Sequence, residues 1–405
     1  PTVAVNVWYH AGSGVEKPGR TGFAHLFEHI LFEGSKNVAE GDFDNLLEAA
    51  GGSNNGSTTT DRTNYYETVP SNALELALFL ESDRMGHLLG AMSPAKVDGQ
   101  RDVVKNERRQ SYENRPYGMS WLRLPELLYP KGHPYSWAPI GSMEDLTAAS
   151  YDDVVDFYKK YYTPGNASLV IAGDINPAQA RAAVEKWFAD VPAGPAAERP
   201  VAAMPRLAAP VREVMEDNVQ LPLLRLVWHS PAAFTPGDAG LGAVAGILAG
   251  GKTSRLYRRL VYELQVAQQV SAYQDGNLLS GTFNIIAVAR PGVPLERLRA
   301  LIDEELARLR AEPPTARELQ RVVNQTESQM LSQLEDLGQK ADLLNTYFFY
   351  ANGNPDYAQE QLAKVQALSP EDVRAATVHW LQPEARVVMS VVPKGKQELA
   401  ASTGL

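Results

Sequence analysis

The spacing of apolar residues predicts helices and strands that alternate along the whole chain. Residues 1–8 alternate apolar and polar positions, as a half-buried strand does. Further helices are expected at Asn72–Leu89, at Pro94 to about Asn114, at Leu295–Leu309 and at Thr315 to about Leu344, and further strands at Leu223–His229 and Gly281–Ala289. This mixture predicts helices packed on one antiparallel or mixed sheet in each half of the chain.

A helix-to-strand unit occurs twice, with an offset of 219 residues. The first begins at Ser150 and Asp153, and the second begins at Ser369 and Asp372. A serine followed three residues later by an acid is typical of a capping box, and both helices end at a proline. Because the offset holds without a gap, we infer that the chain contains two related halves.

A segment rich in Pro and Ala separates these halves. Residues 191–212 have no hydrophobic period, which is typical of a linker. The sequence therefore predicts an N-terminal domain at residues 1–190 and a homologous C-terminal domain at residues 213–405.

Composition narrows the class of protein. Apolar residues make up 44% of the 405, enough for substantial cores, and the net charge of −10 argues against a general nucleic-acid binder. The chain has no cysteine, which excludes disulfides, thiolate metal sites and cysteine nucleophiles. The sequence contains no run of about 18 apolar residues, so it predicts no membrane-spanning helix. Because a folded domain seldom begins within a strand, we expect residues that include a secretion signal to precede Pro1.

The strongest chemical signal is His25-Leu-Phe-Glu28-His29 within a plausible amphipathic helix. His25 and His29 are four residues apart, so both imidazoles project from one helix face and suit a single Zn²⁺. Glu28 can reach a metal-bound water without binding the metal. This is the inverzincin order of the zinc-protease motif.

A catalytic zinc needs a third protein ligand, which here is Asp, Glu or a distant His. Glu107 is one candidate, because it lies on the more apolar face of a charged helix. The other five histidines stand in isolated positions and are expected to be structural or exposed.

The stretches around His25–Ser35 and Gly51–Tyr66 resemble the signature of the pitrilysin, insulin-degrading enzyme and mitochondrial processing peptidase family. The resemblance extends over the whole chain and implies one Zn²⁺ held by His25, His29 and Glu107 of the N-terminal domain. It also implies Glu28 as general base. The implied fold class is α+β, with two homologous α/β sandwich domains, helices on mostly antiparallel sheets, that form half of a clamshell; the C-terminal domain would have no metal site.

The sequence departs from the family pattern in two respects. Gln100 replaces a Glu that relatives carry two turns before the zinc-binding Glu, and it could support the site by a hydrogen bond. In the family, the opposing half of the clamshell supplies an Arg and a Tyr to the active site. The corresponding positions in this sequence are Val261 and Gln268, whose side chains cannot replace them. We therefore expect a heterodimer with a homologous, zinc-less subunit that carries Arg and Tyr; the alternative is a homodimer that works without the pair.

Substrate contacts are expected on a hairpin. The run Asn55–Thr60, a turn at Asp61-Arg62 and the run Thr63–Val69 predict two paired strands. By resemblance the first strand is a sheet edge beside the zinc. An extended peptide could add to it by main-chain hydrogen bonds, with Asn55, Gly56 and Ser57 at the contact.

The sequence is thus interpreted as a zinc metalloendopeptidase that hydrolyses unfolded peptides in an enclosed chamber. Two alternatives remain open: a non-catalytic core subunit of a related complex, and a peptidase that processes a specific leader. A periplasmic or secreted location is expected, with the cytoplasm as the alternative.

Overall fold

Strand β1 (Thr2–Tyr9) runs inside a four-stranded sheet in the computed structural model, which describes residues 1–195 and 197–404. The strand order is β2-β3-β1-β4, and each pair is antiparallel. Side chains alternate across the sheet: Val3 and Val5 enter an apolar core, whereas Asn6 and Trp8 point to the opposite face. The predicted N-terminal strand is confirmed.

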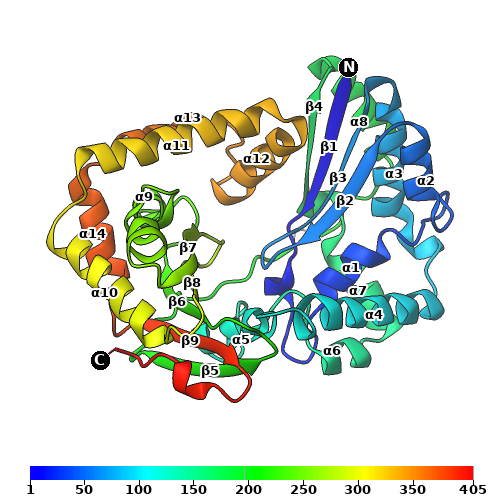
Figure 1. The fold of residues 1–405 in the computed structure, drawn as a ribbon. Coiled ribbons are helices and arrows are strands. Elements are labelled where there is room, and N and C mark those ends of the chain that lie inside the picture. The colour runs from blue at the N-terminus through cyan, green and yellow to red at the C-terminus, as the bar shows by residue number, and fades with distance from the viewer. Residues whose placement is uncertain (196, 405) are drawn as a thin grey trace. The chain divides into compact units, whose positions relative to one another are not determined.

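This sheet belongs to the first of two compact units, formed by residues 1–110, 132–201 and 331–356. Helices cover both faces: α1, α2, α3 and α8 lie on one side of the sheet and α12 on the other (Figure 1). The elements are β1, α1 (Phe23–Ile30), α2 (Asp42–Ala49), β2 (Ser53–Thr58), β3 (Thr63–Pro70), α3 (Leu74–His87), α4 (Pro94–Arg108), α6 (Met143–Ala148), α7 (Tyr151–Tyr161), β4 (Ala167–Gly173), α8 (Pro177–Phe188) and α12 (Leu337–Tyr350).

The second unit comprises residues 111–131, 202–330 and 357–404. Its five-stranded sheet has the order β5-β9-β6-β8-β7, and only the β5–β9 pair is parallel. The elements are α5 (Met119–Leu128), β5 (Val211–Asp217), β6 (Leu223–Ser230), α9 (Asp238–Ala249), the π-helical segment η6 (Tyr257–Glu263), β7 (Ala267–Asp275), β8 (Gly281–Ala289), α10 (Leu295–Ala311), most of α11 (Ala316–Glu335), α13 (Ala358–Gln366), α14 (Pro370–Trp380) and β9 (Arg386–Pro393). Both units therefore have the predicted α+β class with mostly antiparallel sheets.

Each unit includes a helix from the other half of the sequence. Helix α12 packs on the first sheet, where Ala341 contacts Ala4 and Asp342 accepts hydrogen bonds from Asn6 Nδ2 (3.3 Å) and Trp8 Nε1 (3.0 Å). Helix α5, conversely, packs in the second unit against β9. The compact units therefore cross the predicted linker, and the division into residues 1–190, 191–212 and 213–405 stays a prediction about the two sequence halves.

The repeated helix-to-strand unit is confirmed. Helices α7 and α14 both begin with a complete capping box, at Ser150 and Ser369, and both are followed by a sheet strand at the predicted offset. The helix expected from Thr315 to about Leu344 is interrupted instead. Asp336 caps a new helix by accepting a hydrogen bond from the Gln339 amide, so α11 ends and α12 begins there. Nowhere in the described ranges does a helix have the length and apolarity needed to cross a membrane.

Candidate metal centre

Helix α1 buries one apolar face and leaves a polar one. Leu26, Phe27 and Ile30 are fully buried, which anchors the helix against the first unit. His25 and His29 lie one turn apart on the other side, with ring centroids 4.9 Å apart. The spacing of the two histidines in the sequence is therefore realised as a pair of neighbouring imidazoles.

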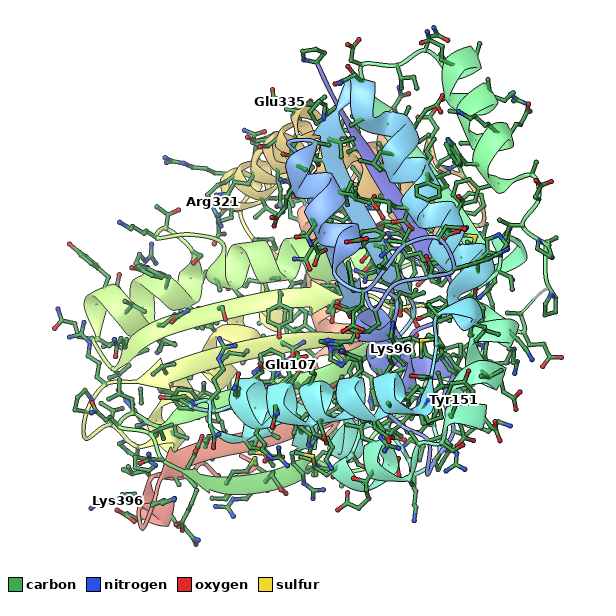
Figure 2. The ribbon with its side chains drawn as sticks, turned by 90° about the vertical axis from the view of Figure 1, so that its right-hand side faces the viewer. Lys96, Glu107, Tyr151, Arg321, Glu335 and Lys396 are labelled. Atoms are coloured by element: carbon green, nitrogen blue, oxygen red, sulfur yellow. The ribbon has the colours of Figure 1, made fainter. Side chains whose placement is uncertain are left out.

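Helix α4 brings a carboxylate to this pair. Glu107 Oε2 lies 3.1 Å from His29 Nε2 and 3.5 Å from His25 Nε2. Two ligands on a tetrahedral Zn²⁺ with bonds of about 2.0–2.1 Å stand about 3.4 Å apart, so these separations fit one ion. In the part of the chain that the structure describes, these three residues are the one group of His and acidic side chains that could hold a metal. Figure 2 labels Glu107 on α4.

The protonation states also suit a metal. Burial lowers the pKa of His25 to about 4, so its imidazole is neutral near pH 7. A hydrogen bond from His29 lowers the pKa of Glu107, which keeps this carboxylate ionised. A neutral imidazole and a carboxylate are the forms that bind Zn²⁺. The donor set therefore fits the ion that the sequence predicts.

Glu28 stands beside this group without belonging to it. Its Oε2 accepts a hydrogen bond of 2.6 Å from the Thr58 hydroxyl, while burial raises its pKa. Strand β2 passes close by: a Cβ on Gly56 would come within 3.2 Å of Glu28 Cγ. A glycine at position 56 therefore leaves space for the Glu28 side chain, and the raised pKa makes this carboxylate a better proton acceptor near neutral pH.

The predicted hairpin is confirmed as β2 and β3, with β2 at the edge of the sheet. The three predicted contact residues do not all face the metal group. Gly56 faces Glu28, whereas Ser57 Oγ donates to Asn64 Oδ1 (2.6 Å) on the opposite side of the strand. Asn55 Oδ1 accepts from the Gly56 amide (2.8 Å). Strand alternation explains the difference, because successive side chains point to opposite faces.

Gln100 does not touch the three candidate ligands. Its Nε2 donates to Glu33 Oε1 at 2.7 Å, and Lys96 Nζ donates to the Glu33 carbonyl oxygen at 2.6 Å. Burial raises the pKa of Glu33, and His29 is among the charges that act on it. Any support that Gln100 gives to the site therefore passes through Glu33.

Sequence reasoning missed Glu33 and Glu16. Glu33 follows His29 by four residues, a spacing that could have drawn attention to it. Glu16 is buried and accepts hydrogen bonds from the amides of Gly22 (3.0 Å) and Ala24 (2.8 Å) at the start of α1. Burial raises the pKa of Glu16 to about 8. No local pattern announces this contact, because the carboxylate returns to the helix from a loop.

The two positions that correspond to the family's Arg and Tyr lie in the second unit. Val261 lies in η6 and packs partly buried against the apolar core of that unit. Gln268 lies at a register shift in β7 and is exposed. Their side chains offer neither a guanidinium nor a phenol.

Comparison with known proteins assigns both halves. The family profile described as "Insulinase (Peptidase family M16)" matches residues 1–123, which contain His25, Glu28, His29 and Glu107. The profile described as "Peptidase M16 inactive domain" matches residues 148–326, which contain none of them.

Individual relatives indicate the same family. The zinc protease PqqE of Helicobacter pylori is 30% identical over 395 residues, or 95% of this chain and 87% of that protein. The crystal structure of a protease from Helicobacter pylori has a TM-score of 0.91 at 27% identity and covers 97% of this chain and 94% of that one. The periplasmic protease PqqL from Escherichia coli shares the fold, with a TM-score of 0.81 at 19% identity; the match covers 99% of this chain and 46% of PqqL. Matches to two M16 profiles, and a relative of this identity and coverage, make the chain a member of the M16 peptidase family.

Proposed function

We propose that this chain is a zinc-dependent endopeptidase in which His25, His29 and Glu107 hold one Zn²⁺ and Glu28 is the general base. The proposal rests on one observation above all: Glu107 Oε2 lies within 3.5 Å of the Nε2 atoms of both histidines, with the Glu28 carboxylate beside them on the same helix. The names of the relatives, which are zinc proteases, support the choice of metal and reaction.

When bound, zinc supplies Lewis acidity that polarises a peptide carbonyl and lowers the pKa of a coordinated water. Glu28 accepts the proton of the attacking water and then delivers it to the leaving amine. The Thr58 hydroxyl holds Oε2 of this carboxylate, which orients it for both transfers. Burial raises the pKa of Glu28 and so strengthens it as a base.

Strand β2 would hold the substrate. It is the edge strand of the sheet, and Gly56 brings its backbone next to Glu28. An extended peptide paired with this edge would lie beside the candidate metal ligands, bound mainly through its main chain. Recognition of this kind favours unfolded peptides over a single sequence.

Removal of one metal ligand is expected to weaken zinc binding by more than about 100-fold. Loss of a residue that only hydrogen-bonds to a metal ligand already lowers metal affinity about 10- to 100-fold. Glu107→Gln is the change, and Glu48→Gln, an exposed acid on α2, is the matched control. Competition with a chromophoric chelator measures the affinity. One zinc per chain in the wild type and in Glu48→Gln, and none in Glu107→Gln, is the expected pattern; equal affinity in all three would refute the ligand assignment.

We further infer that activity needs a homologous, zinc-less partner subunit, because Val261 and Gln268 cannot stabilise the charge that develops on the substrate oxygen. A homodimer that works without the pair is the alternative. The periplasm is the compartment we propose, on the strength of a relative described as a periplasmic protease.

Mixing tests the partner proposal. The zinc-loaded chain alone is expected to hydrolyse a quenched peptide slowly, and addition of a homologous chain with Arg and Tyr at these two positions is expected to raise the rate by about 10²-fold or more. The double variant Val261→Arg, Gln268→Tyr is expected to recover part of this activity without the partner. Full activity of the unmodified chain alone would refute the requirement, and no activity in any mixture despite bound zinc would favour a non-catalytic core subunit.

A further inference from the structure

A cavity lies entirely within the second unit, on the sheet face opposite the apolar core. It has a volume of about 590 Å³, within the range of small-ligand sites. Strands β6, β8 and β7 form its floor and the segment 111–121 forms its wall. Its lining combines the apolar side chains of Leu223, Ile286 and Val288 with the buried Arg225 and the exposed Arg115, and Trp121 comes from the wall.

Arg225 is the unusual residue in this cavity. Its neighbours on β6, Leu224 and Leu226, point into the core, so Arg225 points to the cavity face. The residue is 1% exposed, and its Nη1 donates to Ser120 Oγ at 3.3 Å. Its Nε and Nη2 atoms have no well-formed hydrogen bond, and the one further polar group that acts on the guanidinium as a hydrogen-bond partner is the phenol of Tyr273.

Three arginines among the described residues are fully buried, and two of them form an ion pair with an acidic side chain. Arg84 pairs with Glu81, and Arg386 pairs with Asp303. Arg225 forms no ion pair with any acid among the residues that the structure describes. A cation taken out of water without a counter-charge is unfavourable unless something else compensates it.

The neighbours of Arg225 compensate it only in part. Its Cζ lies 3.8 Å from the Trp121 ring centroid, a favourable cation–π contact with a half-exposed indole. Burial raises the pKa of Tyr273, so this phenol is neutral near pH 7 and brings no negative charge. A positive charge therefore remains inside a cavity that has room for an anion.

The wall of the cavity is held in an unusual backbone conformation. Tyr117 has a φ of 63°, and a Cβ on Gly118 would lie 2.1 Å from the Tyr112 carbonyl oxygen. Tyr117 is fixed by its amide, which donates to Asp217 Oδ2 (2.7 Å), and by its phenol, which donates to the Leu221 carbonyl (2.9 Å). Backbone strain maintained by such contacts is typical of ligand sites.

We propose that this cavity binds a carboxylate on Arg225, with an apolar group of the same ligand on the floor formed by Leu223, Ile286 and Val288. Arg225 is the one buried guanidinium of the lining, since Arg115 is exposed, and it matches a single negative charge. Its planar fork matches the geometry of a carboxylate. The C-terminal end of a peptide with an apolar last residue has both features. The peptide as the source of the carboxylate rests on the proposed peptidase function, whereas binding can be measured without any turnover.

Calorimetric titration of the zinc-loaded chain tests the proposal. The probes are N-acetyl-leucine, N-acetyl-leucine amide, N-acetyl-glutamate amide and inorganic phosphate. N-acetyl-leucine is expected to bind, whereas N-acetyl-leucine amide is expected not to bind. N-acetyl-glutamate amide is expected to bind more weakly than N-acetyl-leucine, because its carboxylate stands at the end of a longer side chain and it has no apolar group. Arg225→Met is expected to weaken binding by about 10- to 100-fold, the usual range for charged hydrogen bonds. Arg258→Met, an exposed arginine of the same unit, is the matched control and is expected to change nothing.

A second variant keeps the test decisive if Arg225→Met fails to fold. Arg225 pairs with Ile286 across the sheet, and Ile286 pairs with Ser271, so Arg225 and Ser271 share one row with Cα atoms about 10 Å apart. Ser271→Glu places a carboxylate within reach of Arg225. It is expected to raise the melting temperature and to abolish binding of N-acetyl-leucine.

The possible results of these titrations either support or contradict the carboxylate site. Binding of the acid but not the amide, lost in Ser271→Glu, supports the carboxylate site whether or not the chain proves to be a peptidase. Absence of any binding to the wild type, equal binding of acid and amide, or binding of phosphate alone would overturn it.

Discussion

Glu28→Gln is expected to lower kcat/KM for peptide hydrolysis by about 10²- to 10⁴-fold and to leave zinc binding unchanged. The substitution keeps the size of the side chain and its contact with Thr58, but an amide cannot accept the proton of the attacking water. Glu28 does not share the group of atoms that His25, His29 and Glu107 bring together, so the metal affinity has no reason to fall.

The assay uses the zinc-loaded chain under the condition that gives the highest activity, alone or mixed with its partner, and Glu48→Gln serves as the exposed control on α2. Zinc content measured on the same samples distinguishes loss of the base from loss of the metal. Full activity of Glu28→Gln would exclude this residue as the base, and a zinc-free variant would place it among the ligands.

Arg84→Met is expected to lower the free energy of unfolding by about 3–5 kcal/mol, the range for breaking a buried ion pair. Arg84 and Glu81 are both fully buried on α3, and Arg84 Nε donates to Glu81 Oε2 at 3.0 Å. A second buried acid, Glu67, lies 3.6 Å from Nη2, and burial and then Glu81 raise its pKa. Removal of the arginine would leave the Glu81 carboxyl group buried and without its partner.

This cluster is also connected to the candidate metal helix. The guanidinium of Arg84 lies 4.2 Å from the Tyr65 ring centroid, and the Tyr65 hydroxyl donates to the Phe27 carbonyl of α1 at 3.0 Å. We therefore expect zinc affinity to fall together with stability in Arg84→Met. The prediction concerns a buried pair, whereas exposed ion pairs contribute only about 0–1 kcal/mol.

Urea unfolding monitored by tryptophan fluorescence measures the change, and Arg258→Met, which breaks an exposed ion pair with Glu263, is the control. A double variant, Arg84→Met with Glu81→Leu, is expected to recover most of the stability because both partners of the buried pair are replaced by apolar side chains. A loss below about 1 kcal/mol in the single variant would contradict the importance of this pair.

Short-range signals in the sequence predicted much of the local structure. Apolar periodicity located β1, β6 and β8, and capping residues located the starts of α7 and α14. These features depend on side chains within a few residues of one another, which is why they can be read along the chain. The histidine pair belongs to the same class, because one helical turn sets its geometry.

Contacts between distant segments could not be predicted in this way. The residues alone supported Glu107 only weakly, and a resemblance to a family was needed to select it. The possible support of the site by Gln100 stays a prediction, and the structure identifies Glu33 as the hydrogen-bond partner of its amide. The long helix expected after Thr315 is interrupted at Asp336. Each of these outcomes depends on which side chains the folded chain brings together.

The sequence by itself therefore determined the elements, the repeat and the His25-Glu28-His29 constellation, since each follows from local spacing. Only the tertiary structure decided that Glu107 converges on both imidazoles, that α12 packs on the N-terminal sheet, and that Arg225 is buried without an acid. The physical reason is that burial and long-range charge pairing depend on the packing of the whole unit, which periodicity along the chain does not encode.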